Sequence, residues 1–113
     1  DFVWDMLGDI DIALLPIDTS RHVMGWDHVE AIIERLRPKV VVPHHYYIWD
    51  VTQRQSTLQS ADPWVNERDG AVWLDSAIKT YTPEDVAGLD RKVHYFGDHV
   101  AFDKEAWRTD DTL

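Results

Sequence analysis

The chain has 113 residues, 44% of them apolar, which is enough for one domain with a hydrophobic core. Its net charge of −10, from 21 acidic and 11 basic residues, argues against nucleic acid or an anionic membrane as a partner. Because there is no cysteine, a metal ion would have to be held by His, Asp or Glu. The sequence has no long apolar run and no targeting signal, so we expect a cytoplasmic protein with no membrane span.

A strand–helix–strand unit is the clearest pattern. The apolar run at 10–17 predicts a buried strand, although a short run of this kind is also compatible with a helix. Apolar residues at helical intervals predict a helix at 27–37, which Pro38 ends. The β-branched run at 39–43 predicts a second strand, buried on both faces. Two strands joined in this way should be parallel, with a right-handed crossover.

Capping signals predict where two helices begin. Asp27 followed by Glu30 resembles a capping box at the start of the first helix. Thr82 followed by Pro83 predicts a second, short helix with Thr as its cap, and Gly88 should end it.

The rest of the chain has weaker patterns. Residues 48–70 are polar with isolated tryptophans and predict a long loop that could contain a short helix and cover a nearby site. Short apolar runs at 71–74 and 77–81 predict two strands joined by a turn. The runs at 93–96 and 99–102 flank a Gly-Asp pair and predict a hairpin.

Two histidines follow the second predicted strand, at the end where open α/β sheets bind ligands. An imidazole held just past a buried strand suits a metal ligand, and His45 is the candidate. The alternative for His45 is a partly buried histidine that is hydrogen-bonded to the next loop. Side chains alternate along a strand, so His44 should point to the opposite side and at most one of the pair faces a site.

Two further residues could lie beside such a site. Asp18 follows the first strand and could reach the same edge of the sheet, or it could simply begin a turn. Tyr46 could line a pocket or pack into the core. The sequence has no phosphate-binding glycine loop, no Gly-x-Ser-x-Gly motif and no cysteine nucleophile, so nucleophilic triad chemistry is unsupported.

Two motifs together resemble a known family. Residues 11–17 read D-I-A-L-L-P-I, and residues 36–46 read L-R-P-K-V-V-V-P-H-H-Y, with a helix between them. This order is similar to the carboxyl-terminal half of a metallo-β-lactamase-fold hydrolase, closest to the branch with ascorbate-phosphate lactonase-like and phospholipase D-like members. The resemblance covers residues 9–47 well and the remainder loosely.

The resemblance implies a role for His45. It matches the late histidine that binds one metal of the family's site, whereas His44 stands where the family often has Met. The metal, Zn²⁺ or Mn²⁺, would activate water against an ester, lactone or phosphodiester in a small-molecule substrate. The family's H-x-H-x-D-H ligand cluster is absent from this sequence, so we expect the isolated chain to bind metal weakly and to be inactive.

The expected architecture is α/β: a βαβ unit followed by short strands and helices, about half of an αββα sandwich. Residues 1–113 would form a single domain, the carboxyl-terminal fragment of a larger one. Half a sandwich leaves one sheet face uncovered, which predicts exposed apolar surface and either a homo-oligomer or packing against the missing amino-terminal half. The competing hypothesis is a non-catalytic α/β binding or interaction module.

Overall fold

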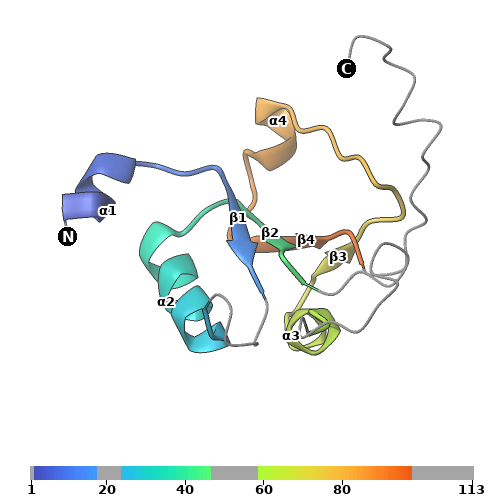
Figure 1. Cartoon of the computed structure of the whole chain (residues 1–113). Coiled ribbons are helices and arrows are strands. Elements are labelled where there is room, and N and C mark those ends of the chain that lie inside the picture. The colour runs from blue at the N-terminus through green and yellow to red at the C-terminus, as the bar shows by residue number, and fades with distance from the viewer. Residues whose placement is uncertain (1, 18–23, 47–58, 98–113) are drawn as a thin grey trace, which may run out of the picture.

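The computed structural model describes residues 2–17, 24–46 and 59–97 (Figure 1). Asp18, residues 48–58 of the predicted loop at 48–70 and the predicted strand at 99–102 lie outside this part of the chain. The elements, in chain order, are α1 (Phe2–Leu7), β1 (Ile12–Pro16), α2 (Trp26–Leu36), β2 (Val40–His44), α3 (Asp62–Asn66), β3 (Val72–Trp73), α4 (Pro83–Val86) and β4 (Lys92–Tyr95). No helix in the described ranges has the length and apolar character needed to cross a membrane.

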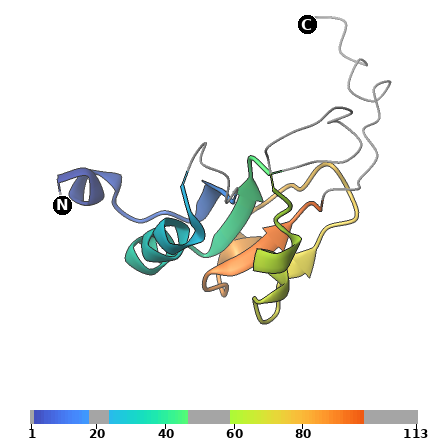
Figure 2. The ribbon, with the colours of Figure 1, turned by 60° about the horizontal axis from the view of Figure 1, so that its bottom comes forward.

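The described strands form one sheet in the order β1-β2-β4-β3, and every neighbouring pair is parallel. Figure 2 shows the strands side by side. β1 and β2 pair from Ile12 opposite Val40 to Pro16 opposite His44. The predicted parallel strand–helix–strand unit is therefore confirmed, with strand bounds within two residues of those expected.

The sheet has two faces that are covered differently. On the first face, Ala13 and Val41 pack with α2 and α3 in the larger core cluster. On the second face, Val40 and Val42 pack with Val86 of α4 in a smaller cluster. Figure 1 shows α2 and α3 on one side of the sheet and α4 on the other. Since Val40, Val41 and Val42 are all buried, β2 is covered on both faces, as its composition predicts.

The second face and α1 leave apolar surface exposed, as expected for an incompletely covered sheet. Leu14 of β1 is 63% exposed, and Val72 of β3 is 38% exposed. α1 has no buried residue, and Phe2 and Met6 are among its exposed side chains. In the described part of the chain, apolar side chains on the second face and on α1 are therefore left in contact with solvent.

The two predicted helix caps have different outcomes. Thr82 caps α4 as predicted: its Oγ1 accepts from the Asp85 N–H at 3.3 Å, and its own N–H donates to Asp85 Oδ2 at 2.8 Å. The capping box at Asp27 was wrong. Gly25 is the N-cap of α2 and makes no side-chain cap bond, so Asp27 lies inside the first turn. The helix begins earlier because Trp26 packs against the core cluster.

The predicted strand at 77–81 was also wrong. Residues 77–80 are exposed and form no strand, and Ile78 is 78% exposed. The preceding β3 pairs with β4 instead, and Leu74 extends this pairing by donating its N–H to the Tyr95 carbonyl at 2.7 Å. The chain then turns at Ser76, whose Oγ accepts from the Ile78 N–H at 3.1 Å.

One buried histidine lies on the second face of the sheet. His94 of β4 is 8% exposed, and its Nδ1 lies 2.7 Å from the Tyr81 hydroxyl. Burial lowers the pKa of His94 from its ordinary value of 6.5, and the positive charges of Lys79 and Lys92 lower it further. The neutral ring is therefore the form that the folded chain favours.

This shift predicts acid destabilisation that begins near pH 6.5. As the pH falls through 6.5, the unfolded chain takes up a proton at His94 before the folded chain does, so the free energy of unfolding decreases until the lowered folded pKa is passed. Urea midpoints measured between pH 7.5 and 5.5 should fall, and His94→Gln should flatten this dependence. His28→Gln, at an exposed position of α2, should leave it unchanged. Equal slopes in the parent and His94→Gln would contradict the assignment.

Candidate functional site

Because the strands are parallel, their carboxyl ends meet at one edge of the sheet. We call this the carboxyl edge and define it as Ile17 after β1, His44–Tyr46 at the end of β2, and Phe96–Gly97 after β4. A hydrogen bond of 3.0 Å from the Ile17 N–H to the His44 carbonyl holds the first two segments together. The candidate metal ligand and its neighbours lie on this edge.

His45 is the first residue after β2, and its side chain is exposed. Its backbone is left-handed, with φ of 55°. Histidine tolerates this conformation better than most residues, but it remains uncommon outside glycine. Within the described residues the imidazole has no hydrogen-bond partner. An exposed, uncommitted imidazole on a rigid sheet edge suits one coordination position of a metal ion.

His44 is the last residue of β2, and its imidazole belongs to the second face. Partial burial lowers its pKa from 6.5, and the neighbouring His45 charge lowers it further. A hydrogen bond to the backbone of Leu14 acts in the opposite direction. Both His44 and His45 are exposed residues at this edge. The alternation of side chains places the two imidazoles on different sides of the strand, and the choice of His45 as the ligand stays a prediction.

Tyr46 turns back into the protein from the same edge. It is 6% exposed and belongs to the larger core cluster. Its hydroxyl donates to the Gly97 carbonyl at 3.0 Å, and its ring lies 5.1 Å from that of Tyr95. The Tyr46 side chain therefore packs into the core, which is one of the two predicted alternatives. Its role beside a metal ligand stays a prediction.

Two features of this edge were missed by the sequence interpretation. Tyr95 donates its hydroxyl to Asp62 Oδ1 at 2.7 Å, which joins the end of β4 to the start of α3. Gly97 belongs to a predicted hairpin turn whose second strand lies outside the described residues; its carbonyl also accepts from Tyr46, and its φ is 79°. The glycine was the available signal, because a positive φ after a strand often requires that residue.

The described residues do not form a complete metal site. Nowhere in these ranges do three or more His, Asp or Glu side chains gather closely enough to hold a metal ion. His45 fits a single coordination position, and the remaining ligands would have to come from elsewhere. Asp18, the other residue predicted near this edge, lies outside the described residues.

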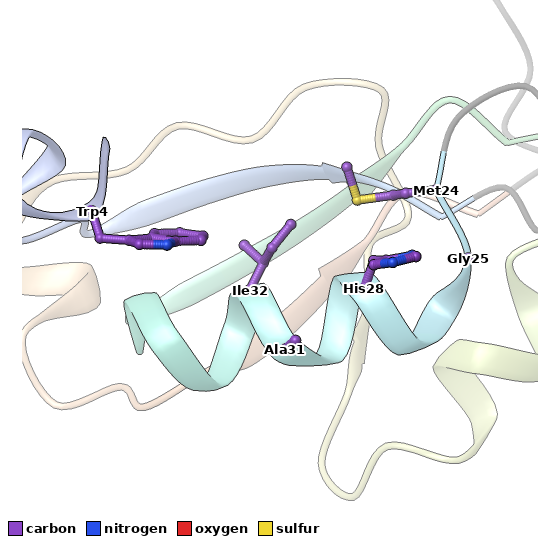
Figure 3. Close-up of a pocket in the computed structure, with 6 residues that line it drawn as sticks. All are labelled: Trp4, Met24, Gly25, His28, Ala31 and Ile32. Atoms are coloured by element: carbon purple, nitrogen blue, oxygen red, sulfur yellow. The ribbon is translucent and has the colours of Figure 1, made fainter. Parts of the chain in front are cut away.

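An open, largely apolar pocket of about 500 Å³ lies elsewhere, between α1 and the start of α2. Figure 3 shows its lining residues, Trp4, Met24, Gly25, His28, Ala31 and Ile32. None of these is a predicted site residue, and His28 is the sole titratable side chain among them. The pocket is therefore distinct from the carboxyl edge.

Comparison with known proteins identifies the fold. No family model matches the chain. A UPF0173 metal-dependent hydrolase of Pyrococcus abyssi is 42% identical over 45 residues, which are 40% of this chain and 20% of that protein. A Thermotoga maritima crystal structure, classed as a zinc-dependent hydrolase of the metallo-β-lactamase superfamily, matches 81% of this chain with a TM-score of 0.62 and 20% identity. The chain has part of the metallo-β-lactamase fold.

The match confirms the resemblance at the level of the fold, without distinguishing a branch. The metallo-β-lactamase likeness extends beyond residues 9–47, on which the motifs rested, since it covers 81% of the chain. The chain spans 44% of the solved structure and a fifth of the curated relative. The predicted α/β class is confirmed by the same match.

Proposed function

We propose that this chain supplies one side of a divalent-metal site in a metal-dependent hydrolase, with His45 as one ligand. The observation that carries the proposal is the exposed imidazole at the carboxyl edge of a metallo-β-lactamase fold. The two similar proteins described above, one named a metal-dependent hydrolase and the other classed as zinc-dependent, support it.

The metal in this proposal is Zn²⁺ or Mn²⁺. When bound, such an ion lowers the pKa of a coordinated water and polarises an ester, lactone or phosphodiester bond. The contribution of this chain is to hold the His45 imidazole at a fixed place directly after β2. The chain has a net charge of −10 and so offers little electrostatic attraction to a phosphorylated small molecule. In this proposal the metal ion would supply that attraction.

The proposal also includes cover for the second face of the sheet. Leu14 and Val72 are exposed there, and the solved neighbour contains a larger portion of fold than this chain matches. We expect that portion, in the same gene product or in a second copy, to pack on the second face and to bring further ligands to the carboxyl edge.

Metal content of the full-length gene product tests the proposal. His45→Ala should lower bound Zn²⁺ or Mn²⁺ by more than about tenfold, because loss of a ligand exceeds the effect of losing a supporting residue. His44→Ala, and His28→Ala at an exposed position of α2, are matched controls that should keep the metal. Bound metal is measured by mass spectrometry, and hydrolysis is assayed with model esters, lactones and phosphodiesters.

Two results would contradict the proposal. Unchanged metal content in His45→Ala would remove its central residue. A folded full-length product that binds no metal and hydrolyses nothing would favour the competing binding module. The isolated 113-residue chain should bind metal weakly and show no turnover.

A further inference from the structure

We propose that Tyr46 is a positioning residue: it sets the orientation of His45 by tying the segment after β2 to the end of β4. The inference rests on the proposed role of His45 as a metal ligand. Neither the burial of Tyr46 nor its place after His45 in the sequence requires this role.

The first observation is the backbone of His45. Its φ of 55° lies in the left-handed region. This conformation costs free energy for a non-glycine residue and persists only where the surrounding structure holds it. The preceding strand fixes the chain up to His44, whose carbonyl accepts from Ile17. A second anchor is needed on the far side of His45.

Tyr46 provides that anchor one peptide bond away. Its hydroxyl donates to the Gly97 carbonyl at 3.0 Å, and its side chain is nearly fully buried. With His44 fixed to β1 and Tyr46 fixed to the end of β4, the backbone of His45 is held from both sides. The imidazole then projects from a segment with little freedom left to lose on binding a metal.

The anchor is itself held by a second layer. The Tyr46 ring packs at 5.1 Å on Tyr95, which is fully buried. Tyr95 in turn donates to Asp62 Oδ1 at 2.7 Å, and Trp73 packs edge-on against it at 4.8 Å. Three segments distant in sequence therefore support Tyr46, from α3, β3 and β4.

A purely structural tyrosine would give a different result from a positioning one. Removing its hydroxyl would then lower stability and leave metal geometry unchanged. Tyr81 offers a matched comparison, because its hydroxyl also makes one hydrogen bond, at 2.7 Å to His94 Nδ1, but on the second face of the sheet. Tyr46→Phe and Tyr81→Phe each delete one hydroxyl and keep the ring.

The test uses the full-length gene product loaded with Co²⁺. Tyr46→Phe should weaken Co²⁺ binding about tenfold and shift the visible absorption bands that report ligand geometry. Tyr81→Phe should leave both unchanged. In the metal-free protein, the three-bond coupling between the amide and α protons of His45 should change in Tyr46→Phe alone, which gives a readout independent of activity.

Asp62 provides a second route to the same answer if Tyr46→Phe fails to fold. Asp62→Ala removes the acceptor of Tyr95 and should shift the Co²⁺ bands part of the way, whereas Asp62→Asn keeps an acceptor and should restore them. Normal Co²⁺ affinity and bands in Tyr46→Phe, or in Asp62→Ala where Tyr46→Phe does not fold, would overturn the inference while leaving the role of His45 intact. Unchanged metal binding in His45→Ala would overturn both.

Discussion

Trp64→Ala should lower the free energy of unfolding of this chain by about 3–5 kcal/mol, the range for losing a buried tryptophan. Trp64 is 2% exposed, at the centre of the larger core cluster. Its Nε1 donates to Glu30 Oε1 at 2.9 Å, and the Arg68 guanidinium lies 4.3 Å above its ring. Arg68 also forms an ion pair with Glu30, so Trp64 and Arg68 both bind this residue of α2.

Urea unfolding followed by circular dichroism measures this loss. Trp73→Ala is the matched control: Trp73 is 49% exposed and packs edge-on against Tyr95, so its loss should cost about 1 kcal/mol. Trp64→Phe keeps most of the buried ring but removes the bond to Glu30, and should fall between the two. Comparable losses at Trp64 and Trp73 would show that α3 does not pack as described.

Local signals explain what the sequence predicted well. The helix predicted at 27–37 shows apolar residues at helical spacing and ends before Pro38, and β2 begins with a β-branched run. Each of these patterns depends on residues that are close to one another in the sequence. The parallel pairing of β1 with β2 followed from the connection alone.

Long-range contacts explain what the sequence did not predict. β3 pairs with β4 rather than with the following run at 77–81, and β4 lies between β2 and β3. No local pattern specifies which strand is inserted between two others. A short apolar run becomes a strand where a partner is available, and Ile78 has none among the described residues.

The candidate site divides in the same way. His45 was identified from its place after a strand and from a family resemblance, both readable in sequence. The link from Tyr46 to Gly97 joins residues 51 apart, and the link from Tyr95 to Asp62 joins residues 33 apart. The sequence predicts His45 as the candidate ligand, whereas the contacts around it form only in the folded sheet.

Val41→Asp should leave this chain largely unfolded at pH 7. Val41 is fully buried in β2, between β1 and β4, and faces α2 and α3. An unpaired carboxylate there would cost more than about 4 kcal/mol, comparable to the whole stability of a small domain. Loss of the far-ultraviolet circular dichroism signal and of dispersed amide resonances would report unfolding.

Leu14→Asp is the matched control, because Leu14 is on neighbouring β1 but 63% exposed on the second face. In the 113-residue chain it should change the free energy of unfolding by less than about 1 kcal/mol. In the full-length gene product the same substitution should destabilise far more, because the proposed cover would bury the carboxylate. A small effect in both forms would mean that nothing packs on this part of the second face, and the remaining metal ligands would then have to reach His45 from another direction.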